Sequence, residues 1–241
     1  MELWQGLLLI LVGLGAGFVQ RVSGFGLGIF AMMFLPHFMP SHTAAATVST
    51  LFSCVTSTYN AVKYRKNVVY KTALPMLCAA LVTIPAAVYG SVLISGKVFE
   101  TVLGGVLIAL SIYFLLFSER ISIKPSTAGG VMAGALGGAL NGLFSTGGPP
   151  VVLYLSNALK ENLAYFATIQ FYFSLTNLYS AGSRVVSGIV TGQVLLCASV
   201  GLLGCMLGDA LGKRVFDRMN AKMLKNIIYI GMILSGILMM F

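Results

Sequence analysis

Charged residues are scarce in this sequence. Only 9% of its 241 residues are Asp, Glu, Lys or Arg, and 58% are hydrophobic, whereas about a quarter of a typical soluble domain is charged. Uncharged runs extend over residues 72–96 and 162–183, and a helix needs about 20 apolar residues to cross the hydrocarbon core of a bilayer. The composition therefore excludes a soluble globular protein and predicts an all-α polytopic membrane protein.

Side chains suited to catalysis or metal binding are scarce as well. The sequence has six acidic residues, two histidines and four cysteines, without paired carboxylates, a nucleophile patterned with a histidine, or metal-ligand spacing. We therefore expect no enzyme activity, no metal site and no cofactor. Although the net charge is +9, the basic residues form short clusters between apolar runs, which is typical of membrane-protein loops and not of nucleic-acid binding.

Two glycine-rich segments interrupt the apolar runs. The first break reads QRVSGFGLG at residues 20–28, and the second break reads NGLFSTGGPP at residues 141–150. Backbone groups that lose their helical partners at membrane depth are tolerated only where protein or a water-filled cavity satisfies them. The two breaks therefore predict a site inside the membrane, which we expect them to form together.

The segments around the breaks also form an internal repeat. GLGAGFVQRVSGFGLG aligns with ALGGALNGLFSTGGPP, and YGSVLISGKVF with LGDALGKRVF, in each case about 120 residues later. The alignment predicts two structural copies, residues 1–122 and 123–241, in a single integral membrane domain. Each copy would consist of a broken helix pair followed by three transmembrane helices. The expected helices are 42–62, 72–94 and 99–117 in the first copy and 162–182, 189–211 and 223–241 in the second.

The broken pairs are expected at 3–19 with 24–36 and at 127–143 with 148–158. The segment after the first break is short, because twelve residues from Phe25 to Pro36 cover about 18 Å at 1.5 Å per residue. We therefore favour a re-entrant hairpin in each copy, with its tip near the midplane of the membrane. Two full spans in each pair are the alternative.

Basic residues in the loops predict that the two copies are inverted. Four Lys or Arg residues lie in loop 63–71, but only Arg184 lies around 183–189; by contrast, the loop at 95–98 has one lysine and 213–225 has five basic residues. Lysine and arginine in short loops resist translocation. The opposite bias predicts copies of opposite orientation, with both termini outside.

The residues that follow each break favour an anion as the ligand. Pro149 and Pro150 suit the first turn of a helix, and a helix N-terminus offers free N–H donors and partial positive charge. Two inverted hairpins would bring both helix starts to one cavity, as in several secondary transporters. The predicted ligands at the breaks are Ser23, Gly24, Phe25, Gly26, Asn141, Ser145, Thr146, Gly147, Gly148 and Pro149.

Three further side chains are candidate ligands. Arg21 lies in the first break with no other charge between Glu2 and Lys63 and no acidic partner evident in the sequence, and its guanidinium suits an oxyanion. The alternative for Arg21 is an anchor at the membrane interface. Gln170 and Asn177 share one face of an expected helix with Ser174, and they are predicted to line the cavity.

Small residues at four-residue spacing predict close helix contacts. Gly130, Gly134, Gly138 and Gly142 form one such series, and Gly204, Gly208 and Gly212 form another. A stripe of mostly hydroxyl side chains on the helix after Ser41 is also interpreted mainly as packing. Its members are Thr43, Thr47, Thr50, Cys54 and Ser57.

The segments GFVQRVSGFGLGIFAMMFLP, YRKNVVYKTALP and GGALNGLFSTGGPPVVLYL resemble the TauE/SafE family of sulfite and organosulfonate exporter-like permeases, over about residues 8–238. The resemblance implies an inner-membrane permease for sulfite, an organosulfonate or another small organic acid. Many family members have a small or hydroxylated residue near Arg21, so its charge marks either a particular substrate or an interface anchor. The family motifs map to Gly24, Phe25, Gly26, Gly28 and Pro36, and to Gly142, Gly147, Gly148 and Pro149.

The pattern as a whole predicts a secondary transporter that works by alternating access, with a small anion held between the two broken-helix tips. A passive anion channel is the alternative, and a cation or metal permease is a weaker one because the sequence lacks a cluster of suitable ligands. The expected partners are the anion, the lipid bilayer and, in a homodimer, a second copy of the chain. Asp209 is interpreted as an ion near the membrane interface.

Overall fold

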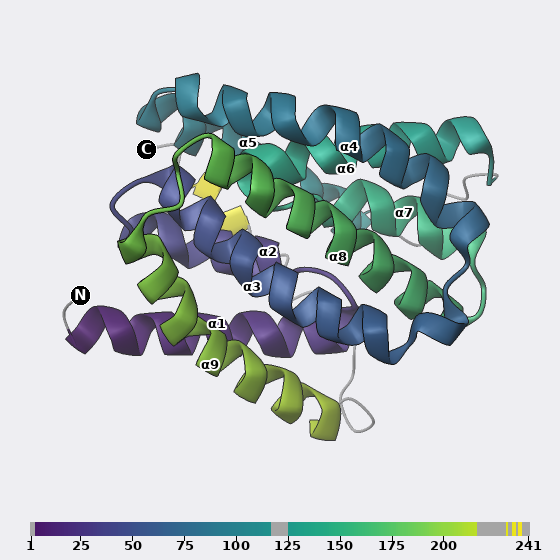
Figure 1. Cartoon of the computed structure of the whole chain (residues 1–241), viewed down its shortest axis with the longest axis horizontal. Helices are drawn as coiled ribbons and strands as arrows, with labels where there is room; N and C mark the ends of the chain where they lie inside the picture. The colour runs from purple at the N-terminus through teal and green to yellow at the C-terminus, as the bar shows by residue number, and fades with distance from the viewer. Residues whose placement is uncertain (1–2, 117–124, 216–229, 231–232, 235, 238–241) are drawn as a thin grey trace.

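Helices make up all the regular secondary structure of the residues that the computed structural model describes, which are 3–116, 125–215, 230, 233–234 and 236–237 (Figure 1). Short 3-10 turns, η1 (Leu35–His37) and η2 (Arg65–Asn67), flank α3. The expected helix 223–241 and the expected boundary at 122/123 fall largely or wholly outside these residues. The α-helices are α1 (Leu3–Ser23), α2 (Leu27–Phe34), α3 (His42–Lys63), α4 (Tyr70–Leu93), α5 (Gly96–Leu116), α6 (Thr127–Phe144), α7 (Gly148–Ala158), α8 (Asn162–Val186) and α9 (Gly192–Val215).

Four of these helices, α1, α4, α5 and α9, are long and apolar enough to cross a membrane. The helices α3 and α8 are as long, at 22 and 25 residues, but their polar stripes make them less apolar. They pack against each other (Figure 1), so their polar faces are buried by protein. The helices confirm the all-α membrane fold that the composition predicts.

Each break joins a long helix to a short one that turns back along it. The ring of Phe30 in α2 lies against Gly15 of α1. In the same way Tyr154 of α7 lies against Gly130, and its hydroxyl donates a 2.9 Å hydrogen bond to the carbonyl of Ser126 at the start of α6. The short helices have 8 and 11 residues, or about 12 and 16 Å. Both pairs are therefore helical hairpins.

The predicted glycine contacts lock the hairpins to helices from the other half of the sequence. In α6, a Cβ on Gly134, Gly138 or Gly142 would collide with α4. In α9, a Cβ on Gly204 or Gly208 would collide with the backbone of α1. The prediction of close helix packing at these glycines is confirmed. In both pairs, glycines further along one helix contact residues further along the other. The paired helices therefore run parallel.

The central pair, α3 and α8, runs antiparallel. The hydroxyls of Thr58, in the last third of α3, and Ser174, in the middle of α8, lie 2.9 Å apart. The rings of Tyr64 and Phe166 meet at the end of α3 and the start of α8, with centroids 5.4 Å apart. Consequently, the start of α3 and the end of α8 lie together at the opposite end of the pair.

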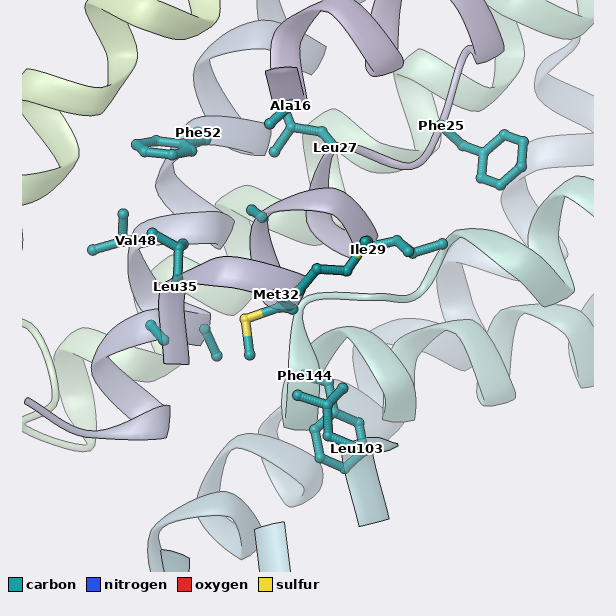
Figure 2. Packing of buried hydrophobic residues seen from close by; sticks show 14 of the residues in the cluster. Ala16, Phe25, Leu27, Ile29, Met32, Leu35, Val48, Phe52, Leu103 and Phe144 are labelled. Carbon is teal, nitrogen blue, oxygen red and sulfur yellow. The ribbon is translucent and has the colours of Figure 1, made fainter. Parts of the chain in front are cut away.

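The short helix α2 lies inside the protein. Leu27 and Ile29 are at most 3% exposed and Met32 is fully buried. Figure 2 shows these side chains on α2 in one buried cluster with Phe52 of α3 and Phe144 of α6. Because α2 is covered by protein, its position fixes the first break in the interior.

Candidate functional site

The two breaks meet inside the protein. A Cβ on Gly28 would collide with the carbonyl of Ser145, so only glycine allows α2 to approach the second break this closely. A Cβ on Gly148 would lie 3.2 Å from the ring of Phe25. The two hairpin tips, far apart in the sequence, are therefore in direct contact.

A polar cavity of about 30 Å³ lies where the tips meet, which is room for about two water molecules. Both breaks and the middle of α3 and α8 contribute to its walls. The lining residues are Gln20, Gly26, Gly28, Ile29, Ser53, Asn141, Ser145, Thr146, Gly147, Gly148, Phe173 and Asn177.

The structure brings together many of the predicted ligands at this cavity and places the others around it. The lining includes Gly26, Asn141, Ser145, Thr146, Gly147, Gly148 and Asn177. The predicted residues Arg21, Ser23, Gly24, Phe25, Pro149 and Gln170 are not part of the lining.

The first break is held by two buried glutamines. The Gln170 side chain donates a 2.8 Å hydrogen bond to the carbonyl of Gly24 and accepts one of 3.3 Å from Gln20. The Gln20 oxygen in turn accepts the N–H of Leu27 at 3.3 Å, at the first residue of α2. Gln170 therefore supports the loop of the first break.

Backbone conformation and one serine complete the first break. Gly24 and Gly26 have φ angles of 78° and 98°, in the left-handed region that favours glycine. The hydroxyl of Ser23 donates to the carbonyl of Val19 at 2.7 Å and also bonds the carbonyl of Phe25. The hydroxyl and the glutamines together satisfy much of the backbone that the break exposes.

The second break is closed differently. Ser145 caps the end of α6 with a φ of 58°, and the N–H of Ser145 donates to the carbonyl of Asn141 at 2.9 Å. The side-chain nitrogen of Asn141 and the hydroxyl of Thr146 are buried without a hydrogen-bond partner. Leaving a buried donor unpaired costs free energy. These two groups can therefore donate to a ligand in the cavity.

Arg21 lies away from the cavity, in the last turn of α1. It is partly buried and donates to the side-chain oxygen of Asn60 at 3.4 Å, with its guanidinium carbon 6.0 Å from the centre of the Phe166 ring. The carboxyl of Asp209 interacts electrostatically with Arg21 and with Lys63. The sequence did not reveal this acidic neighbour, because the packing of α9 on α1 brings Asp209 into the neighbourhood of Arg21.

Arg184 is a buried charge that the sequence analysis missed. Treated above as a loop residue, it lies in the last turn of α8 and is fully buried. It donates to the carbonyls of Gly142 at 2.7 Å and Asn141 at 3.4 Å, and to the hydroxyl of Thr47 at 3.4 Å. A signal for it was present, because Arg184 continues the spacing of Asn177 and Ser180 on one face of α8.

Other cavity residues were not among the predicted ligands either. Ser53 lies one turn from Thr50 and Ser57 in the predicted stripe of α3, so the stripe pointed to the correct face of the helix. Gln20 belongs to the first break, but its role depends on Gln170, which lies 150 residues later. No local pattern reveals such a pair.

The described part of the chain has no group of three or more His, Cys, Asp or Glu residues that could hold a metal ion. Nδ1 of His42 lies 3.3 Å from Oε1 of Glu100, and these two residues line no part of the cavity. The polar groups at the cavity are neutral amides, hydroxyls and backbone, which suit hydrogen bonding to an anion.

Comparison with known proteins gives the family. The sulfite exporter TauE/SafE family matches residues 9–239. The chain belongs to the TauE/SafE family. It is 24% identical over 217 residues to the probable sulfite/organosulfonate exporter TauE of Cupriavidus necator, with 84% of each chain covered. No solved structure matches the chain significantly. Membership of this transporter family, together with the apolar helices, makes the chain a multi-pass integral membrane transporter.

Proposed function

We propose that this TauE/SafE protein is a secondary transporter that moves a small anion, such as sulfite or an organosulfonate, across the inner membrane by alternating access. The cavity between the hairpin tips is the proposed binding site. The observation that carries the proposal is the pair of unpartnered buried donors at this cavity, on Asn141 and Thr146. The name of the Cupriavidus necator relative supports sulfite or an organosulfonate as the substrate.

The packing of the helices supports two inverted copies, residues 1–122 and 123–241. The pairing of α1 with α9 has its counterpart in the pairing of α6 with α4, as expected if a two-fold axis exchanges the copies. The antiparallel pair of α3 and α8 lies on that proposed axis, which would then run in the membrane plane. In this arrangement we place both termini on the outer side of the membrane, as the basic residues of the loops predict.

Alternating access is supported by where the cavity lies. It is bounded by the tips of two hairpins, and each hairpin is locked by glycine contacts to a helix of the other copy. Movement of one hairpin with its partner helix would open the cavity toward one side, and movement of the other would open it toward the opposite side. The anion would stay between the tips in both states.

The test is transport of labelled sulfite and of a small organosulfonate into proteoliposomes. We expect saturable flux with the wild-type protein. Asn141→Asp places a carboxylate where the anion is proposed to bind, and should reduce the flux about a hundredfold because like charges repel strongly in a buried site. A matched control is Asn157→Asp, since Asn157 lies on α7 outside the cavity lining.

Each outcome separates the proposal from its alternatives. Wild-type flux that rises linearly with substrate, without saturation, would indicate a channel. Asn141→Asp protein that is folded and transports sulfite as well as the Asn157→Asp control does would place the site elsewhere. Cation flux that increases in Asn141→Asp would favour a cation permease.

A further inference from the structure

Among the described residues, the fully buried guanidinium of Arg184 has no ionic partner. In the described part of the chain no carboxylate pairs with it, and its contacts are the carbonyls of Asn141 and Gly142 and the hydroxyl of Thr47. Its Nε is buried without a hydrogen-bond partner. A buried charge without a counter-charge is expensive inside a membrane protein and is a functional candidate for that reason.

Part of this charge is offset by the end of α6. The C-terminal carbonyls of a helix carry a partial negative charge equivalent to about half an electron, and Arg184 binds two of the last carbonyls of α6. The remainder of the positive charge has no compensation among the described residues. An anion in the neighbouring cavity would supply it.

Asn141 connects the charge to the cavity. Its carbonyl accepts from Arg184, the residue lines the cavity, and its side-chain nitrogen is buried without a hydrogen-bond partner. One residue therefore binds the guanidinium through its backbone and contributes to the cavity wall. The guanidinium is thus one hydrogen bond away from a residue of the cavity wall.

We infer that Arg184 is the residue that makes the cavity selective for anions: it is the fixed positive charge that a bound oxyanion balances, acting through the end of α6 and not by direct contact. The inference rests on the proposed function and adds to it the source of charge selectivity. It assigns this role to Arg184 rather than to Arg21, whose charge interacts with Asp209.

The sharpest test changes the charge balance without removing the arginine. Thr47 is fully buried and its hydroxyl accepts from Arg184, so Thr47→Asp would place a carboxylate beside the guanidinium and neutralise it within the protein. Thr47→Asn is the matched control, because asparagine has nearly the same shape as aspartate and no charge. We expect the KM for sulfite to be about tenfold or more higher in Thr47→Asp than in Thr47→Asn.

A second pair of variants separates charge from hydrogen bonding. Arg184→Lys keeps the charge, whereas Arg184→Gln keeps N–H donors for the α6 carbonyls and loses the charge. If Arg184 acts by its charge, the lysine variant retains sulfite transport and the glutamine variant loses most of it. If Arg184 only caps α6, the two variants behave alike.

Sulfite-dependent heat stabilisation of the detergent-purified proteins gives a readout that does not depend on flux. We expect sulfite to raise the melting temperature of the wild-type, Thr47→Asn and Arg184→Lys proteins, but not of Thr47→Asp. Equal KM and equal stabilisation in Thr47→Asp and Thr47→Asn would overturn the inference and leave the proposed function intact. Absence of saturable flux and of stabilisation in the wild type would instead remove the proposed function itself, and the inference with it.

Discussion

Gln20 and Asn141 occupy the same place in the two hairpins, each three residues before the last residue of its long helix. Both side chains are buried amides that line the cavity. The amide of Gln20 is bonded to Gln170 and to the backbone of Leu27, whereas the nitrogen of Asn141 has no partner. At two equivalent positions, one amide is thus bonded within the protein and the other keeps a donor without a partner.

The next residue shows the same contrast. Arg21 follows Gln20, and its side-chain stem packs against Gly212 of α9. Gly142 follows Asn141, and its carbonyl accepts a hydrogen bond from Arg184. The first tip is therefore closed by Gln20 and Ser23 together with Gln170 of α8, while the second tip keeps buried donors without a partner. The first tip thus serves mainly as structural support, and the second tip mainly forms the wall that faces the ligand.

The largest expected effect is a difference in stability when a methyl group is added to one tip or to the other. Gly28→Ala would drive a Cβ into the carbonyl of Ser145, whereas the Cβ of Gly148→Ala would meet side chains alone, Phe25 at 3.2 Å and Phe173 at 3.7 Å. We expect Gly28→Ala to lose about 3 kcal/mol of stability and Gly148→Ala less than about 1 kcal/mol. Melting of the detergent-purified proteins, followed by size-exclusion chromatography, measures the difference. Equal melting temperatures would contradict the close contact of the tips.

An intermediate effect is expected for two variants that distinguish structural support of the tips from ligand binding. Gln170→Leu leaves the carbonyl of Gly24 and the amide of Gln20 without their partner, which should cost about 1–3 kcal/mol of stability. Thr146→Val removes a hydroxyl that has no partner, so stability should change by less than about 0.5 kcal/mol while the KM for sulfite rises. Melting and flux measured on both variants test this. Loss of stability in Thr146→Val would show that its hydroxyl supports the fold.

The smallest effect is expected for Arg21. Because Arg21 lies outside the cavity lining and interacts with Asp209, Arg21→Gln should change the KM for sulfite by less than about threefold. The comparison is with Arg184→Gln in the same flux assay. A larger loss of sulfite transport in Arg21→Gln than in Arg184→Gln would indicate that Arg21 belongs to the binding site.

Much of the fold could be predicted from the sequence because its signals are local. The second hairpin was expected at 127–143 and 148–158 and is found at Thr127–Phe144 and Gly148–Ala158. Proline at the start of a helix and the glycine spacing fix these limits. The contacts of Gly134 and Gly138 likewise follow from a spacing that any reader of the sequence can see.

The site could be predicted only in part, since its remaining features depend on residues far apart in the chain. Charge counting assigned Arg184 to a loop, because only the packing of α8 against α3 and α6 shows that it is buried. The role of Gln170 changed for a similar reason: its partner Gln20 belongs to the other half of the sequence. A polar stripe indicates which face of a helix is buried but not whether its members bind a ligand or one another.

During synthesis, the glycine faces of α1 and α6 meet their partner helices at different times. When α1 enters the membrane, the helix that its Gly13 and Gly17 contact, α9, has not yet been made. By contrast, α6 emerges when its partner α4 is already in place. The nascent first hairpin must therefore remain without its main neighbour until almost all of the described chain has left the ribosome, which makes it the part of the protein most exposed to premature association and to membrane quality-control proteases.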